Sequence, residues 1–373
     1  MPPAHNTPLY PLLLDPILVE RIWGGTRLAG LLGKPLSGAR IGETWESAAE
    51  ARVANGPLAS ETLGALSRAH GPRLIGTRPR VTEDVPFPLL AKFIDAEAVL
   101  SVQVHPDDSY AQAQLSEPFG KTEAWYIVAA EPGAVIYHGL RDLDDADAVA
   151  GALRRGVIRE HLCAVPVHAG DTLFTPAGTV HAIGAGIILY EIQQYSDATL
   201  RLYDWDRVGD DGQPRTLHLD HGVATCDPAT PGEHTTRPQA LDDRGERALL
   251  VACRYFALEL WRPLSGSVLA TDGTTCHLLT VLAGQLRIHT AGSLPIDAAP
   301  GRTILLPAAP GDHRLEATAE TRILDAYVPD LARDVVAPLR ARGVPDAQIA
   351  RVGGGVPAGN DLLPLLEAVE RGA

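Results

Sequence analysis

Two polar residues stand in an otherwise mostly apolar stretch, Leu-Ser-Val-Gln-Val-His, at residues 100–105. Alternation along a β-strand sends residues two apart to the same face, so Gln103 and His105 are expected to point the same way. An imidazole nitrogen and an amide oxygen both bind metal ions. The stretch therefore predicts a strand with a metal-binding pair, in which glutamine takes the place where a second histidine is usual.

A third ligand is predicted from a turn motif later in the chain. Residues 170–181 fit the pattern G-x5-P-x-G-x2-H, which resembles the second motif of the cupin superfamily. Its glycines and proline favour a tight hairpin that directs His181 inward. Glu123 begins a further predicted strand and supplies a carboxylate. Gln103, His105, Glu123 and His181 thus offer nitrogen and oxygen ligands for a divalent metal, with room for substrate oxygens.

Lysine occurs only at positions 34, 92 and 121, whereas the other 29 of the 32 basic residues are arginine. An ammonium is a compact charge with a tunable pKa, which a guanidinium is not. A chain that uses arginine for its surface charge has little reason to keep a lysine. Lys92 and Lys121 lie close to the metal motifs and are predicted to be functional, whereas Lys34 is predicted to be a surface residue.

The composition excludes several classes of partner. The net charge is −14 and no basic run occurs, so nucleic acid and anionic membranes are not expected partners. No run of about 18 apolar residues suggests a membrane span. The first residues lack the basic start of a signal peptide. Four scattered cysteines fit free thiols in a cytoplasmic protein.

Short apolar runs bounded by Gly, Pro or Asp predict a mainly β fold. Helices are expected at 62–71, with Gly71 as the stop, and in an insertion near 140–163. Residues 209–239 are polar, rich in Pro, Gly and Thr, and are expected to form a long connection. The strands of the first part are predicted within 87–95, 100–105, 124–130, 133–139, 171–176 and 186–194.

A second strand-rich block follows from about residue 247 to 328. The segment Gly-Arg-Thr-Ile-Leu-Leu-Pro at 301–307 repeats the Gly-x5-Pro spacing of 170–176, which suggests two copies of one small barrel. We expect three parts: a metal-binding domain at 1–235, a second, metal-free domain at 236–330, and a helical extension at 331–373. The extension is expected either to cap the second barrel or to be partly loose.

Four segments, in order, resemble type I mannose-6-phosphate isomerases of the shorter bacterial form. They are LSVQVHPDD, GKTEAWY, PAGTVHAIG and QQYSDATLRLYDWDR. The upstream RIWGG, GETWE and PLLAKFIDA also fit, so the resemblance covers about residues 9 to 330. It implies two cupin (jelly-roll) barrels with a small helical insertion, and a monomer or homodimer. It also implies a Zn²⁺ ion in the first barrel and interconversion of mannose 6-phosphate and fructose 6-phosphate.

The resemblance also assigns roles residue by residue. Gln103, His105, Glu123 and His181 match the zinc ligands. Lys121, Asp197 and Arg201 match active-site positions, and Asp197 is a proposed proton-transfer group. Lys92 and Ser101 match positions near the sugar-phosphate pocket, which Lys121 and Arg201 also line. Asp197, Lys121 and a metal-bound water all remain candidates for the catalytic base.

One position departs from the long form of the family, which has a histidine where this chain has Gly120, so any role given to that histidine cannot hold here. Two other functions stay open. One is an iron-dependent cupin oxygenase, against which Gln103 argues because such enzymes prefer imidazoles. The other is a sugar-phosphate sensor without turnover, against which the intact ligand set and Lys121 argue.

Overall fold

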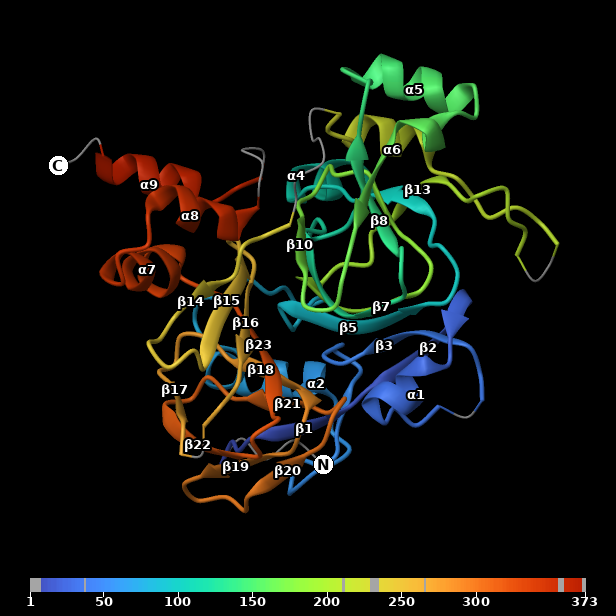
Figure 1. Ribbon diagram of the computed structural model, residues 1–373. Coiled ribbons are helices and arrows are strands. Elements are labelled where there is room, and N and C mark those ends of the chain that lie inside the picture. The colour runs from blue at the N-terminus through green and yellow to red at the C-terminus, as the bar shows by residue number, and fades with distance from the viewer. Residues whose placement is uncertain are drawn as a thin grey trace.

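The strands in the described part of the chain form four antiparallel sheets, and the fold is mainly β, as expected (Figure 1). The structure is a computed structural model. It describes residues 8–36, 38–209, 212–228, 235–264, 266–354 and 359–370. For residues 369 and 370 it describes the backbone only.

The first half of the chain builds two of these sheets, and its predicted strands are confirmed. A six-stranded sheet has the order β10-β7-β12-β5-β2-β3, and a five-stranded sheet has the order β13-β6-β11-β8-β9. The six strands are Thr172–Thr175, Glu123–Ala130, Ile187–Gln194, Leu89–Ala96, Ile17–Gly25 and Ile41–Trp45. The five are Leu200–Tyr203, Val102–Val104, His181–Ile183, Val135–Leu140 and Leu162–Pro166.

The second half builds the other two sheets, with the help of two strands from the N-terminal region. The eight-stranded sheet has the order β14-β15-β16-β23-β18-β21-β1-β4, and the four-stranded sheet has the order β17-β22-β19-β20. The eight strands are Gln239–Ala240, Arg247–Ala252, Ala257–Trp261, Arg322–Tyr327, His277–Ala283, Thr303–Leu306, Leu12–Asp15 and Arg52–Val53. The four are Val268–Thr271, Gly311–Ala317, Leu286–Thr290 and Ile296–Ala298. Thus β1 and β4 belong to a sheet made mostly of residues beyond 238.

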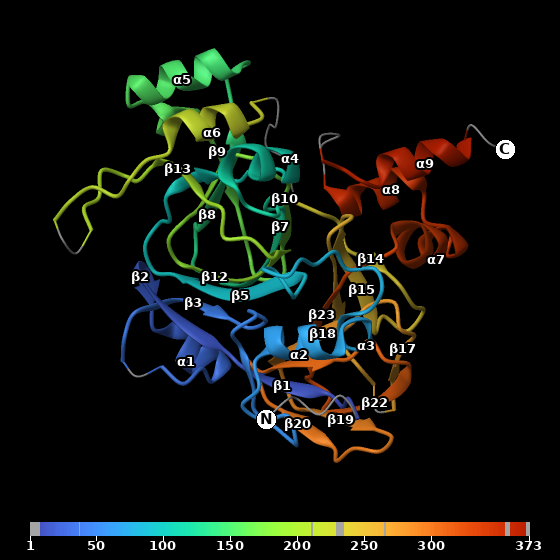
Figure 2. The ribbon, with the colours of Figure 1, turned by 180° about the vertical axis from the view of Figure 1, so that it is seen from behind.

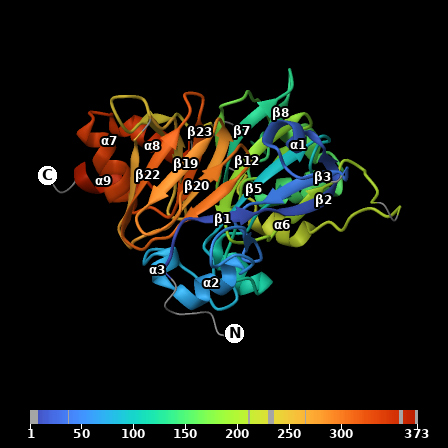
Figure 3. The ribbon, with the colours of Figure 1, turned by 90° about the horizontal axis from the view of Figure 1, so that it is seen from below.

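The two larger sheets pack face to face, so the two halves lie side by side (Figure 3). Phe93 of β5 and Tyr190 of β12 share one apolar core with Leu258 of β16 and Leu324 of β23. Because side chains alternate along a strand, the residues between them point the other way, into the interior of each half. Strands β5, β7 and β12 are therefore largely covered on both faces, and polar residues on their inner faces lie deep in the first half.

The helices agree with the prediction in two places, and one further helix was not predicted. Helix α2 (Leu63–His70) begins after Thr62 and ends at Gly71 as expected. The insertion contains α5 (Ala146–Arg154) and the 3-10 turn η2 (Ile158–His161). The long connection at 209–239 also contains a helix that was not predicted, α6 (Leu219–Thr225). The remaining helices of this half are α1 (Arg27–Leu32), α3 (Pro72–Ile75), α4 (Asp108–Tyr110) and η1 (Ala111–Leu115).

Packing explains why α6 forms in so polar a segment. It lies beside α5 at one end of the first half (Figure 2). A Cβ at Gly222 of α6 would lie 2.3 Å from the Leu202 side chain, so a larger residue there would require this side chain to shift. Residues 210, 211 and 229–234 of the same connection lie outside the described residues.

The C-terminal extension is helical and caps the second half. It consists of η3 (Leu331–Val336), α7 (Ala337–Ala341), α8 (Asp346–Ala350), η4 (Arg351–Gly353) and α9 (Leu363–Glu370). Val335, Leu339 and Leu362 are buried against Leu249 and Ala257 of the eight-stranded sheet. Of the two alternatives, capping therefore holds for the described part. Most of the Gly-rich segment at 353–359 lies outside it.

Candidate active site

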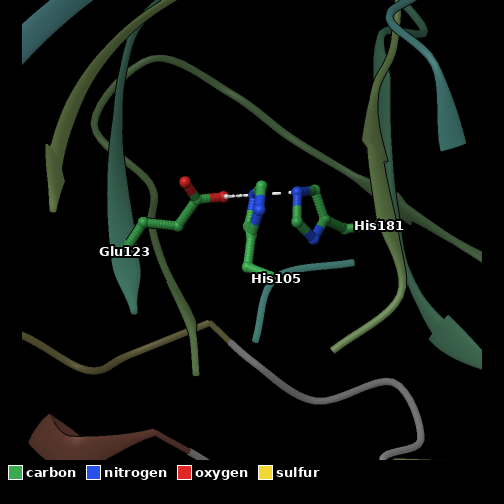
Figure 4. A group of neighbouring side chains, drawn as sticks. All are labelled: His105, Glu123 and His181. Atoms are coloured by element: carbon green, nitrogen blue, oxygen red, sulfur yellow. Dashed lines mark ion pairs between the residues drawn. The ribbon is translucent and has the colours of Figure 1, made fainter. Parts of the chain in front are cut away.

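Three side chains from three strands meet inside the first half (Figure 4). His105 follows β6, Glu123 begins β7 and His181 begins β11. Glu123 Oε1 lies 3.5 Å from His105 Nε2 and 3.3 Å from His181 Nε2. All three side chains are buried. Among the described residues, this is the group of His, Cys, Asp or Glu whose spacing suits a metal ion, with its ligand atoms within 4.8 Å of one another.

The orientation of both rings suits a metal. His105 Nδ1 lies 2.8 Å from the carbonyl oxygen of Ala198, and His181 Nδ1 lies 2.9 Å from that of Thr179. A carbonyl can only accept, so each Nδ1 donates and each Nε2 keeps its lone pair for the centre of the group. His105 Nε2 and Glu123 Oε1 are buried without a partner in hydrogen-bond geometry, whereas Glu123 Oε2 faces the Lys121 ammonium. These orphaned acceptors fit a cation between them.

Burial also keeps the two rings neutral, as metal ligation requires. It lowers the pKa of His105 and lowers the pKa of His181 to about 3, despite the opposing carboxylate of Glu123.

Gln103 lies at the border of this group. It is the register partner of His181 across β6 and β11, and its amide Nε2 lies 3.2 Å from His181 Nε2. The Ser101 hydroxyl donates to Gln103 Oε1 at 3.4 Å. In this rotamer the amide nitrogen faces the histidine. A half turn of the terminal amide, which interchanges two nearly isosteric atoms, would turn the oxygen inward instead.

The hairpin before His181 explains why this histidine enters the site. Gly178 adopts φ +88°, a conformation that favours glycine, and its N–H donates to the carbonyl of His105 at 2.9 Å. This hydrogen bond connects the turn before His181 directly to the backbone of His105, another residue of the metal group. Gly120 is constrained too, because a Cβ there would lie 2.4 Å from the backbone of Asp107. No histidine fits at this position.

Both lysines predicted to be functional reach the site. The Lys121 ammonium lies 2.8 Å from Glu123 Oε2 and 3.9 Å from Glu191 Oε1. Burial by itself would lower the pKa of Lys121, but the carboxylates of Glu123 and Glu191 outweigh this effect. The pKa of Lys121 is therefore raised, and the side chain stays an ammonium. Lys92 Nζ lies 3.5 Å from Glu191 Oε1 and 3.9 Å from Asp197 Oδ1.

One expectation about a neighbouring side chain was wrong. Lys34 is not on the surface: it is 4 % exposed and pairs with the buried Glu46 away from the metal group. Trp45 is half-buried, and the Lys92 ammonium lies 5.1 Å from its ring centroid.

Glu191 is the site residue that the sequence analysis missed. It lies on the inner face of β12, and its Oε2 accepts a hydrogen bond from Trp125 Nε1 at 3.0 Å. Burial, with the nearby Glu123 carboxylate, raises the pKa of Glu191 to about 7. A signal was present, because Glu191 is the one charged residue in the apolar strand 187–194. Such a residue in a buried strand usually has a specific partner or role.

A cavity of about 250 Å³ opens beside the metal group. Asp197, in the loop before β13, and Arg201, within β13, both line it. Five basic side chains line the cavity against three acidic ones, so it favours an anion. The basic ones are Arg21, Lys92, Lys121, Arg201 and Arg215, and the acidic ones are Glu43, Glu191 and Asp197.

Comparisons with known proteins identify the family of this chain. The family model described as the type I phosphomannose isomerase catalytic domain matches residues 12–129. The chain is 38% identical over 315 residues to mannose-6-phosphate isomerase ManA of Bacillus subtilis, a match covering 83% of this chain and 97% of that protein. It is 36% identical over 302 residues to mannose-6-phosphate isomerase of Streptococcus mutans, covering 80% and 92% of the two chains. The chain therefore belongs to the type I phosphomannose isomerase family.

Solved structures give the same result. The crystal structure of the mannose 6-phosphate isomerase from Bacillus subtilis superposes with a TM-score of 0.77 at 28% identity, covering 85% of this chain and 99% of that one. A putative mannosephosphate isomerase from Archaeoglobus fulgidus superposes with a TM-score of 0.66 at 20% identity, covering 86% and 98%, and shares the fold.

Proposed function

We propose that this chain is a zinc-dependent mannose-6-phosphate isomerase, which interconverts mannose 6-phosphate and fructose 6-phosphate. The observation that carries the proposal is the buried group of His105, Glu123 and His181 beside a cavity lined by cations, in a chain of this family. The ligand set is proposed to be these three residues with Gln103. Two imidazoles, a carboxylate and an amide oxygen suit zinc. When bound, the ion would act as a Lewis acid on the sugar oxygens.

The side chains around the cavity supply binding and charge. The substrate phosphate is dianionic, and we assign its attraction to Lys92, Lys121 and Arg201, which concentrate positive charge inside a negative protein. Ser101 lies next to Gln103 and offers a hydroxyl to a sugar oxygen. Lys121, held as an ammonium, donates hydrogen bonds to negative charge that develops on the sugar oxygens.

Isomerisation moves a proton between C1 and C2 of the sugar, so a positioned base is needed. Asp197 is our first candidate, because its carboxylate is 64% exposed and lies at the cavity beside Lys92. Glu191 is the second candidate. It lies deeper, between Lys92 and Lys121, where it can also hold both ammonium groups in place.

The proposal also covers the barrels, the location and the oligomeric state of the protein. Each pair of sheets is proposed to close as a cupin barrel, with boundaries near residues 235 and 330. The protein is proposed to be cytoplasmic and a monomer or homodimer. Its four cysteines carry free thiols, which agrees with a reducing compartment. None of the described helices is long and apolar enough to cross a membrane.

A coupled assay that reports fructose 6-phosphate formation from mannose 6-phosphate tests the proposal. Turnover that is lost with a chelator and restored by zinc is expected, together with about one zinc per chain by elemental analysis. Binding of mannose 6-phosphate without turnover would identify a sensor instead. Stoichiometric iron without isomerase activity would favour an oxygenase.

A further inference from the structure

The second half of the molecule contains a polar cavity of about 280 Å³, separate from the catalytic cavity. Strands β16, β18 and β23 supply its inner wall, and η3 of the C-terminal extension supplies part of its rim. Its charged lining residues are four basic ones, Arg78, Arg247, His277 and Arg333, and three acidic ones, Glu259, Asp272 and Asp334.

Strand register shows that this cavity is the counterpart of the catalytic one. The strand order β10-β7-β12-β5 in the first half matches β21-β18-β23-β16 in the second. The two Gly-x5-Pro segments align. In the first half the last residue of β10 is the register partner of Glu123. In the second half the last residue of β21, Leu306, is the register partner of His277. Glu123 and His277 therefore occupy the same position.

The same comparison places two more charged residues on equivalent positions. Glu191 of β12 faces Lys92 of β5, and Asp325 of β23 faces Glu259 of β16. Glu191 also faces the residue two after Glu123, and Asp325 faces the residue two after His277. Three charged residues of the first interior thus have three charged counterparts in the second, with different residue types. The first three are Lys92, Glu123 and Glu191, and the counterparts are Glu259, His277 and Asp325.

The carboxylates of this second trio are already used by the protein. Glu259 accepts hydrogen bonds from Arg247, Trp261 and Tyr327 at 2.6 to 2.9 Å. Both oxygens of Asp325 lie 3.0 Å from His277 Nδ1. Since both side chains are buried and occupied in this way, they are poor ligands for a cation from solution.

The cavity instead offers hydrogen-bond donors that are held in position from behind. Arg247 stacks 4.2 Å from the Trp261 ring centroid and binds Glu259. Arg78 is fixed by Asp334, and Arg333 lies 2.7 Å from Asp272. Burial by itself would lower the pKa of His277, but the Asp325 carboxylate outweighs this effect. The pKa of His277 is therefore raised, which favours the imidazolium. A guanidinium has five N–H groups, and the bonds to these carboxylates use only some of them, so the others remain donors for phosphate and carboxylate oxygens.

We propose that this cavity binds a small anion, a metabolite that carries a phosphate or carboxylate group, with Arg78, Arg247, His277 and Arg333 as its donors. The proposal does not depend on the isomerase activity, because none of these residues lines the catalytic cavity. Residues from the N-terminal region, the second half and the extension all contribute, so the site exists only when these three parts are assembled.

Fluorine NMR of the full, metal-loaded chain labelled with 5-fluorotryptophan tests the proposal at each cavity separately. Trp261 reports on the second cavity through Arg247, and Trp23 lines the catalytic one. The probes are inorganic phosphate and citrate, each up to about 10 mM, roughly tenfold above a weak millimolar Kd. We expect the Trp261 resonance, assigned with W261F, to shift and saturate with at least one of the two anions.

The matched variant is R78Q/R333Q, which leaves Arg247 and Trp261 in place. It should bind the anion at least tenfold more weakly by the Trp261 shift, while the Trp23 response and the isomerase turnover stay unchanged. R333Q alone alters a 59% exposed side chain and serves if the double variant fails to fold. A shift with phosphate alone or citrate alone identifies the chemical group. A Trp261 resonance that moves with neither anion, or that moves equally in the variants, overturns the proposal.

Discussion

Lys92 and Glu191 are register partners on adjacent strands, with Nζ 3.5 Å from Oε1 and both side chains about 4% exposed. The same Glu191 oxygen lies 3.9 Å from Lys121. One carboxylate thus sits between the two ammonium groups of the site, and a buried carboxylate in that position compensates charge that would otherwise be unpaired.

Glu191→Gln should reduce turnover by about 10², the usual effect of losing an acid–base or positioning group. The amide keeps the shape and can still accept from Trp125, so the metal content should stay at the wild-type value. Turnover in the coupled assay and metal per chain are the two measurements. Wild-type turnover would assign Glu191 a purely structural role.

Lys121→Met should leave the fold and the metal unchanged and lower turnover by about 10² or more, because an ammonium beside the reacting oxygens is lost. The matched control is Lys34→Met. Lys34 is also buried and paired, but with Glu46 outside the cavity. Its loss should destabilise the chain by about 3 to 5 kcal/mol, typical of an orphaned buried charge, while turnover per folded molecule persists. Equal turnover losses in the two variants would contradict a chemical role for Lys121.

Gln103→His should keep the metal, because His105, Glu123 and His181 already form a three-ligand set. Turnover should fall by about tenfold, which is about 1.4 kcal/mol of barrier, because an imidazole donates more strongly than an amide and makes the ion less electrophilic. Zinc per chain and turnover on mannose 6-phosphate decide this prediction. Full zinc with full turnover would mean that the glutamine is only an alternative to histidine, and loss of zinc would mean that strand geometry selects the amide.

Acid should weaken the second half through His313. Burial, helped by His277, lowers the pKa of His313 to about 4, below the ordinary value of about 6.5. The unfolded chain therefore binds a proton first, and the free energy of unfolding should fall by about 2 to 3 kcal/mol between pH 6.5 and 4. Denaturant titrations at several pH values measure this slope.

The same titrations on His313→Gln should give a smaller loss of stability over that pH range. His289→Gln, which alters a partly exposed histidine on a strand paired with that of His313, is the matched control and should keep the wild-type slope. An unchanged slope in His313→Gln would show that other groups dominate the acid response.

Deleting residues 331–373 should lower stability and solubility more than catalysis. The extension buries Val335, Leu339 and Leu362 against the eight-stranded sheet, and its removal exposes that apolar face. The metal group and its cavity lie in the first half, so turnover per folded molecule should persist. Thermal denaturation and activity at matched folded concentrations test this. A soluble, folded but inactive truncation would contradict the placement of the active site.

The sequence alone predicted the strands β5, β6, β7, β8, β10 and β12 and the candidate metal ligands. Gln103 and His105 could be paired because alternation in a strand is a local property with a period of two. His181 followed from a turn whose glycine conformation is also local. These features depend on neighbours within about ten residues, so they are readable without a fold.

Only the tertiary structure decided which distant residues meet. Glu191 became a site residue because β12 lies between β5 and β7, and Lys34 became buried because Glu46 faces it. Helix α6 formed in a polar segment because Leu202 and its neighbours provide a surface for it. The second cavity joins residues 78, 247, 277 and 333, and such long-range contacts depend on how whole sheets pack, which no local pattern in the sequence specifies.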